Sequence, residues 1–120
     1  MTDPSTPLVA HAHVESFLQW MTVERGRAIN TVVSYRRDLV KYEEFLLSKK
    51  LTILTVEEQD IEKFVKIMQA SGESVASTAR RIAAVRMLHA YLSSEDLRKD
   101  NPTSRLEGVK VPSGVPKPLS

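Results

Sequence analysis

Apolar residues recur at helical spacing in four stretches of the chain, and no stretch shows the strict alternation of a β-strand. The first predicted helix runs from about Val9 to Arg25, and Gly26 is expected to end it because glycine accepts a left-handed conformation. The second is expected to begin at Asn30, a good N-cap residue, and to continue to about Lys49. The first half of the chain therefore predicts two consecutive helices.

Two more helices are predicted in the second half. Thr55 and Glu58 have the spacing of a capping box, which predicts a third helix that continues to about Ala70. The segment "SGES" interrupts the periodicity, and a fourth helix is expected to begin at Ser77, as N-cap, and to end near Ser94. The predicted fold class is all-α, a four-helix bundle.

The character of the chain changes beyond Lys99. The segment "DNPTSRLEGVKVPSGVPKPLS" contains four prolines and two glycines, and it has no lasting period. Such a composition is typical of an extended spacer. We expect a helical domain over residues 1–100 and a linker over residues 101–120 that leads toward a further domain.

Helical geometry separates two adjacent arginines of the second helix. Arg36 falls at the edge of the core stripe, where its aliphatic stem can pack, whereas Arg37 lies nearly opposite the core. The predicted core stripe consists of Val32, Tyr35, Leu39, Tyr42 and Leu46. The polar ridge that includes Arg37 consists of Thr31, Ser34, Arg37 and Lys41.

The fourth helix is expected to present one long cation and several small residues away from its core. The core of this helix is centred on Thr78, Val85, Leu88 and Leu92, and the opposite face is Arg80, Ala83, Ala84, Met87 and Ala90. Small side chains beside an arginine would let the helix approach a DNA major groove closely. The alternative is that the alanines favour helix formation and Arg80 is solvated. Geometry alone does not choose between the two.

Charge is distributed unevenly along the chain, although the net charge is only +2. The segment 25–50 carries seven basic residues against three acidic ones, and the segment 57–73 carries five acidic residues against two basic ones. Arg80, Arg81 and Arg86 then follow with no acid among them. This order predicts one basic and one acidic side of the molecule.

Several classes of site and location are disfavoured by the sequence. The chain has no cysteine, its N-terminus does not resemble a secretory signal, and no apolar run approaches the roughly 20 residues of a membrane span. The cytoplasm is the expected location, and no membrane partner is expected. His11 and His13 are expected in a frayed N-terminus rather than at a metal, and His89 is expected to be packed or hydrogen-bonded at the core edge.

No catalytic set is apparent from the spacing of residues. Tyr35, Tyr42 and Tyr91 lie at helical positions on or near buried faces, where packing is the expected role. We expect no catalytic residue, no metal ligand and no cofactor in this chain. On residue chemistry alone it has the features of a binding module.

The second predicted helix resembles a known signature. "NTVVSYRRDL" is similar to the pattern N-T-x-x-x-Y-x-x-D-L followed by an aromatic residue, which belongs to the core-binding domain of Xer-type tyrosine recombinases; the matching positions are Asn30, Thr31, Tyr35, Asp38, Leu39 and Tyr42. "FLQWMTVERGRAINT" resembles the family's first helix and turn, and "STARRIAAVRMLHAYL" resembles its fourth helix. "DNP" and "VPKPLS" resemble the end of this domain, so the likeness covers residues from about 9 to 120.

Within the family, "ERGRAINTVVSYRRDL" is most similar to the XerD branch. The XerC branch and integrases of phages or transposons are alternatives with the same fold. One departure from the family pattern is Ala28, where many relatives have serine. This departure affects at most one polar contact at the turn before the second helix.

The resemblance implies a fold, a DNA partner and a separate domain for catalysis. The family's core-binding domain is a SAM-like orthogonal bundle that forms half of a C-shaped clamp, with its second and fourth helices against the major groove. The family's arginine, lysine, histidine and nucleophilic tyrosine residues lie on a separate catalytic domain, so this chain is expected to be inactive alone. Complete proteins of the family act as tetramers on paired sites, and the Xer members resolve chromosome dimers. The first helix contributes to contacts between recombinase protomers.

The family's geometry selects the ridges that periodicity places outside the core. The expected partner is a duplex DNA recombination half-site, and the candidate DNA-binding residues are Arg25, Arg27, Thr31, Ser34, Arg37, Lys41, Ser77, Arg80 and Arg81. Thr31 and Ser77 lie near helix N-termini, which favour phosphate. Arg80 is expected to read a base, because a guanidinium can pair bidentately with guanine.

The other candidates have backbone roles or two possible roles. Arg37 is expected to contact a base or a phosphate, Lys41 a phosphate, and Arg25 and Arg27 the DNA backbone. The competing hypothesis from another class is a helical protein-interaction module, in which the exposed charges keep the domain in solution and the first helix docks a partner.

Overall fold

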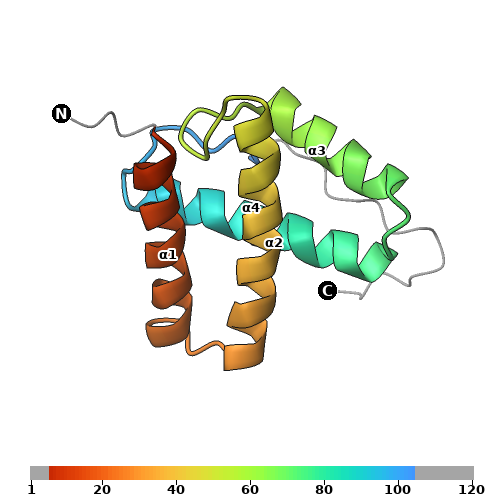
Figure 1. The fold of residues 1–120 in the computed structure, drawn as a ribbon. Coiled ribbons are helices and arrows are strands. Elements are labelled where there is room, and N and C mark those ends of the chain that lie inside the picture. The colour runs from red at the N-terminus through yellow and green to blue at the C-terminus, as the bar shows by residue number, and fades with distance from the viewer. Residues whose placement is uncertain (1–5, 105–120) are drawn as a thin grey trace.

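Four helices build the domain in the computed structural model, which describes residues 6–104. They are α1 (Pro7–Val23), α2 (Ile29–Ser48), α3 (Glu58–Ala70) and α4 (Val75–Ser94). Helices α1 and α2 lie antiparallel, and α4 crosses them at a steep angle, whereas α3 extends away from the end of α2 (Figure 1). Helix α4 contacts each of the other three helices. The predicted all-α four-helix fold is confirmed.

Helix α4 forms the centre of the core. Its buried residues cover more of its circumference than a single stripe would, because α1, α2 and α3 pack against different sides of it. Ala84 was expected on the outward face, but it is fully buried, and Ala83 and Met87 are half-buried. The prediction of an outward small-residue face is therefore wrong at Ala84. Arg80 and Ala90 are exposed, as expected.

The N-caps of α2 and α4 differ from the predicted ones. Ala28, not Asn30, is the N-cap of α2; its backbone is extended and it makes no side-chain capping bond. Ser74, not Ser77, is the N-cap of α4, and its Oγ accepts a hydrogen bond from the backbone N–H of Ser77 at 3.1 Å. Asn30 and Ser77 both have capping chemistry, but their backbones already lie inside the first helical turn.

The start of α3 also differs from the prediction. The capping box pairs Glu57 with Asp60, and the backbone N–H of Glu57 donates to Oδ2 of Asp60 at 3.0 Å. Thr55 instead closes a turn with Thr52, whose backbone N–H donates to Oγ1 of Thr55 at 2.9 Å. A carboxylate pair thus provides the cap that the sequence assigned to Thr55 and Glu58.

The segment after α4 packs back onto the fold. Arg98 donates from Nη1 to the carbonyl of Ile53 at 2.9 Å, from Nη2 to the carbonyl of Val56, and from Nε to Oδ1 of Asp100 at 2.7 Å. Residues 102 and 103 are buried. Residues 102 and 103 of the expected linker therefore lie against the helical domain, and residues 105–120 lie outside the described residues.

Two further expectations concern α1 and the membrane. Gly26 has a φ of 61°, so its predicted left-handed conformation after α1 is confirmed. Over residues 6–104, none of the helices combines the length and the apolar character that crossing a membrane requires.

Candidate nucleic-acid interface

The two helices expected to face DNA meet at a buried carboxylate. Asp38 of α2 is fully buried, and both of its oxygens accept hydrogen bonds from α4. Arg80 donates from Nε to Oδ2 at 2.8 Å and from Nη2 to Oδ1 at 2.9 Å. Arg81 donates from Nε to Oδ1 at 3.3 Å. A single acid of α2 thus holds two consecutive arginines of α4.

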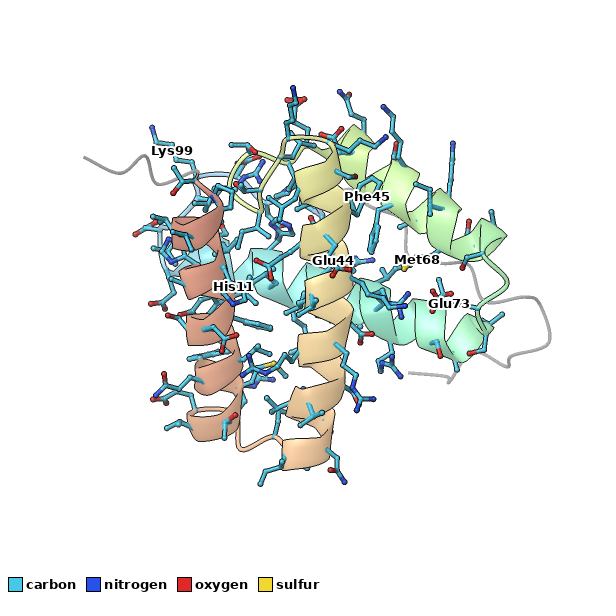
Figure 2. The ribbon with its side chains drawn as sticks, in the orientation of Figure 1. His11, Glu44, Phe45, Met68, Glu73 and Lys99 are labelled. Atoms are coloured by element: carbon cyan, nitrogen blue, oxygen red, sulfur yellow. The ribbon has the colours of Figure 1, made fainter. Side chains whose placement is uncertain are left out.

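Glu73 lies in the turn between α3 and α4 (Figure 2) and completes this arrangement. Arg81 donates from Nη1 to Oε2 of Glu73 at 2.7 Å. Hydrogen bonding to Arg81 lowers the pKa of Glu73, and the bonds to Asp38 raise the pKa of Arg80. We call Asp38, Glu73, Arg80 and Arg81 the junction cluster. Its charges are paired, which is the condition under which a carboxylate and a guanidinium tolerate burial.

The two arginines of the junction cluster differ in exposure. The side chain of Arg80 is 42% exposed, whereas that of Arg81 is 6% exposed. Within residues 6–104, Nη1 of Arg80 has no hydrogen-bond partner, whereas Arg81 uses Nε for Asp38 and Nη1 for Glu73. Arg80 therefore has free donors at the surface, and Arg81 has the surroundings of a structural residue.

The polar ridge of α2 lies beside the junction cluster. Ser34 precedes Asp38 by four residues and Lys41 follows it by three, so all three are neighbours on the helix surface. Arg37 and Lys41 are exposed, whereas Thr31 and Ser34 are half-buried. The structure thus holds the exposed guanidinium of Arg80 at Asp38, about one helical turn from Lys41 on α2.

The remaining candidates lie at helix starts and in a turn. Ser77 is in the first turn of α4 and its hydroxyl accepts a hydrogen bond from Ser74 Oγ at 3.0 Å. Arg25 and Arg27 are exposed between α1 and α2. The guanidinium of Arg25 lies 5.7 Å from the ring centroid of Trp20, within the range of a cation–π contact. Arg25 and Arg27 thus lie in the loop that leads into α2.

The prediction of a positive patch without acids around Arg80, Arg81 and Arg86 is wrong for the folded chain. Asp38 and Glu73 come from other elements and pair with two of its three cations. Asp38 belongs to the family motif, but the motif predicts no role for it, and Glu73 was predicted only as part of the acidic segment 57–73. One signal was available: on α2, Asp38 falls between the core stripe and the polar ridge.

Histidine and tyrosine residues inside the fold have packing roles, as predicted. Tyr42 and His89 are fully buried, and Tyr42 Oη lies 2.8 Å from His89 Nε2. Burial lowers the pKa of His89 to about 3 and raises the pKa of Tyr42. Tyr35 and Tyr91 are half-buried and pack against the core. The buried pair of Tyr42 and His89 is neutral and inward-facing.

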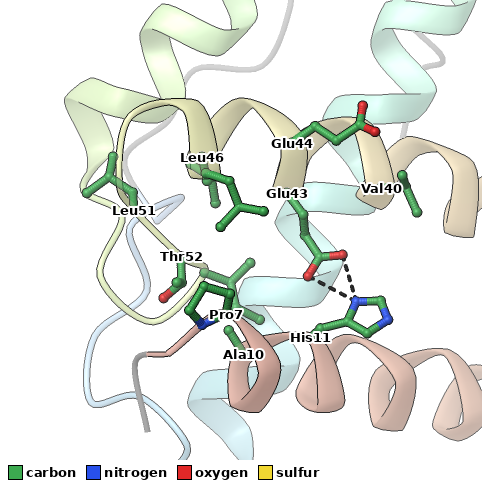
Figure 3. A pocket seen from close by; sticks show the side chains of 11 residues that line it. Pro7, Ala10, His11, Val40, Glu43, Glu44, Leu46, Leu51 and Thr52 are labelled. Atoms are coloured by element: carbon green, nitrogen blue, oxygen red, sulfur yellow. Dashed lines mark hydrogen bonds and ion pairs between the residues drawn. The ribbon is translucent and has the colours of Figure 1, made fainter. Parts of the chain in front are cut away.

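The prediction of a frayed N-terminus at His11 is wrong. His11 and His13 are both inside α1, and Nδ1 of His11 lies 3.0 Å from Oε1 of Glu43 (Figure 3). Glu15 pairs with His11 at 3.4 Å. It also pairs with the guanidinium of Arg36, the arginine that was expected at the core edge of α2. Burial raises the pKa of Glu43, and the hydrogen bond to His11 opposes the rise. These contacts join α1 to α2.

Comparison with known proteins places the chain in a family. Residues 14–96 match the family described as phage integrase, N-terminal SAM-like domain. The chain is 38% identical over 120 residues to the tyrosine recombinase XerD of Rhizobium meliloti, covering 100% of this chain and 37% of that protein.

Two further relatives carry the same name. The XerD of Agrobacterium fabrum is 35% identical over 109 residues, covering 91% of this chain and 33% of that protein, and the XerD of Brucella suis is 39% identical over 107 residues, covering 89% and 35%. The chain therefore spans about a third of the length of the curated relatives it matches. Its four helices and these matches together show that the chain belongs to the phage integrase N-terminal SAM-like domain family, as a core-binding domain of the Xer type.

Proposed function

We propose that this domain binds one half-site of a duplex DNA recombination site through α2 and α4. The observation that carries the proposal is the exposed guanidinium of Arg80, which the buried Asp38 holds beside the cationic ridge of α2. A cation that is already ordered at a helix surface suits the major groove, whose guanine edge offers two acceptors. Arg80 is accordingly assigned to base readout.

Phosphate contacts are assigned to the side chains around Arg80. Arg37 and Lys41 are exposed cations on the ridge, and Arg25 and Arg27 extend the positive surface past the start of α2. Thr31 and Ser77 lie in first helical turns, where backbone N–H groups and the helix dipole favour an anion. Ser34 supplies a further hydroxyl on the ridge. Arg81 is assigned a supporting role, since its side chain is buried between Asp38 and Glu73.

The activity of the whole protein is also part of the proposal, and the names of the relatives support it. The relatives are named tyrosine recombinases. We assign to the full-length protein site-specific recombination in the cytoplasm, a tetramer of recombinase protomers on DNA with α1 at a protomer contact, and resolution of chromosome dimers. The alternative within the same fold is an integrase of a phage or transposon, and the identity of the DNA site separates the two.

A salt titration of binding tests the proposed function. The chain is titrated against a fluorescent duplex of arbitrary sequence, and anisotropy gives the binding constant at each salt concentration. We expect the logarithm of the binding constant to fall linearly with the logarithm of salt, with a slope of about −0.9 for each phosphate contacted. The absence of binding at low salt would contradict the proposal.

The competing function is docking to another protein, and one surface favours it. An apolar hollow lies between the start of α1, the second half of α2 and residues 51–53 (Figure 3). Val40 and Leu47 line it and are 40% and 49% exposed. A domain that binds no duplex at low salt would make this hollow the leading candidate for its function.

A further inference from the structure

We infer that Asp38 is a positioning residue for sequence readout, which fixes the guanidinium of Arg80 so that its Nη1–Nη2 edge faces the base. This inference rests on the proposed function and adds to it a residue that does not touch DNA. It also specifies which edge of Arg80 makes the contact.

The hydrogen bonds that Arg80 already makes to Asp38 determine which edge of its guanidinium is left for DNA. Arginine has five N–H donors, one on Nε and two on each terminal nitrogen. Asp38 accepts from Nε at 2.8 Å and from Nη2 at 2.9 Å, which occupies the side of the fork that contains Nε. Both donors of Nη1 and the second donor of Nη2 are left. These include two parallel N–H groups, which match the O6 and N7 acceptors of a guanine edge.

The carboxylate that holds Arg80 is itself held. Asp38 is fully buried, and its Oδ1 also accepts from Nε of Arg81 at 3.3 Å. Arg81 is anchored to Glu73 at 2.7 Å, so the network ties together α2, α4 and the turn before α4. Arg80 is therefore ordered by folding, and the entropy cost of fixing a long side chain is not incurred when DNA binds.

The charges of the junction cluster separate readout from general attraction to DNA. Arg80 and Arg81 are balanced by Asp38 and Glu73, so the cluster adds no net charge. A guanidinium that is compensated in this way attracts a phosphate less than a free one does. Attraction to the backbone then depends on the exposed cations outside the cluster, which are Arg25, Arg27, Arg37 and Lys41. Arg80 contributes sequence preference.

The test uses the 120-residue chain and two duplexes. A preferred duplex is selected from a pool with a randomised central segment, and a scrambled duplex of the same composition serves for comparison. The measured quantity is the ratio of the two affinities. For Asp38→Asn we expect this ratio to fall by about 5- to 150-fold, the range of one bidentate base contact, while the affinity for the scrambled duplex is kept or rises slightly.

Asp96→Asn is the matched control. It is the same substitution with the same change of charge, at an exposed position whose φ of 57° asparagine accepts well. We expect it to raise both affinities equally and to leave the ratio unchanged. An unchanged ratio in Asp38→Asn as well would overturn the inference.

Arg80→Ala separates failure of the inference from failure of the proposed function. If the ratio of the two affinities is the same for Arg80→Ala as for the unsubstituted chain, Arg80 does not read a base. Both the assignment of Arg80 and the inference about Asp38 are then wrong. If Arg80→Ala lowers the ratio of the two affinities and Asp38→Asn leaves it unchanged, the inference about Asp38 is wrong and the assignment of Arg80 to base readout stands. The double variant is expected to show the ratio of Arg80→Ala alone, because Asp38 acts through Arg80.

If Asp38→Asn does not fold, the inference is tested on the unsubstituted chain. Hydrogen exchange of the arginine Nε–H groups is followed by NMR with and without the preferred duplex. We expect slower exchange for Arg80 than for Arg37 in the free chain, and no loss of this protection in the complex. Equal exchange of the two arginines, or loss of protection on binding, would overturn the inference.

Discussion

Two polar clusters lie one turn apart on the same side of α2, and their chemistry is opposite. Asp38 belongs to the junction cluster, which is charged and opens to the surface at Arg80. Tyr42, four residues later, belongs with His89 to a neutral pair that is fully buried. Each joins α2 to α4 across more than 40 residues of sequence. The interface between α2 and α4 thus has a charged pair that reaches the surface at Arg80 and an uncharged polar pair inside the core.

The largest loss of stability is expected when the carboxylate of Asp38 is removed from the junction cluster. Asp38→Ala leaves the buried guanidinium of Arg81 with Glu73 as its remaining acidic partner and frees Arg80. We expect the free energy of unfolding to fall by about 3 to 5 kcal/mol, the usual cost of breaking a buried ion pair. Urea denaturation followed by circular dichroism measures it. A loss of less than about 0.5 kcal/mol, the range of ordinary surface substitutions, would mean that the junction cluster has no structural role.

The neutral pair is sensitive to acid. Burial lowers the pKa of His89 to about 3, below its ordinary value of 6.5, so the unfolded chain binds the proton first as pH falls. Stability from this group is complete above pH 6.5 and is lost progressively down to about pH 3. At about pH 5 the loss should reach about 2 kcal/mol. Denaturation at a series of pH values checks this, and the His89→Leu variant should lack this part of the pH dependence.

Removing the hydroxyl of the neutral pair should cost less than removing Asp38. Tyr42→Phe keeps the packing of the ring and leaves His89 Nε2 without its partner. We expect a loss of about 1 to 3 kcal/mol, the cost of a buried polar group that has lost its hydrogen bond. Urea denaturation at neutral pH measures it. If Tyr42→Phe costs more than Asp38→Ala, the contrast between the charged and the neutral cluster is wrong.

A smaller effect is expected on the same helix outside both clusters. Ala28 is the N-cap of α2 and provides no side-chain acceptor. Ala28→Ser should stabilise the fold by about 1 kcal/mol, because the hydroxyl can accept from a free N–H of the first turn. Thermal or urea denaturation detects the change, and the pH dependence assigned to His89 should be unaffected. Destabilisation would contradict the assignment of Ala28 as N-cap.

The helices were predictable because their apolar spacing is local, and each was placed to within a few residues. The caps were not, since several polar residues near each start have capping chemistry and only the backbone decides among Asn30, Ser77 and their neighbours. The junction cluster was not predictable either. The partners of Asp38 lie 42 and 43 residues away, and nothing local indicates them. The contacts of Arg98 with Ile53 and Val56 were missed for the same reason, because these backbone carbonyls belong to a distant turn.

DNA binding by the face formed by α2 and α4 is tested by comparing Arg80→Ala with Lys41→Ala on a preferred and a scrambled duplex over a range of salt concentrations. Arg80→Ala should lose about 1 to 3 kcal/mol on the preferred duplex and little on the scrambled one. Lys41→Ala should weaken both and lower the salt slope by about one. If both variants bind both duplexes as the unsubstituted chain does, the face formed by α2 and α4 is not the DNA-binding surface.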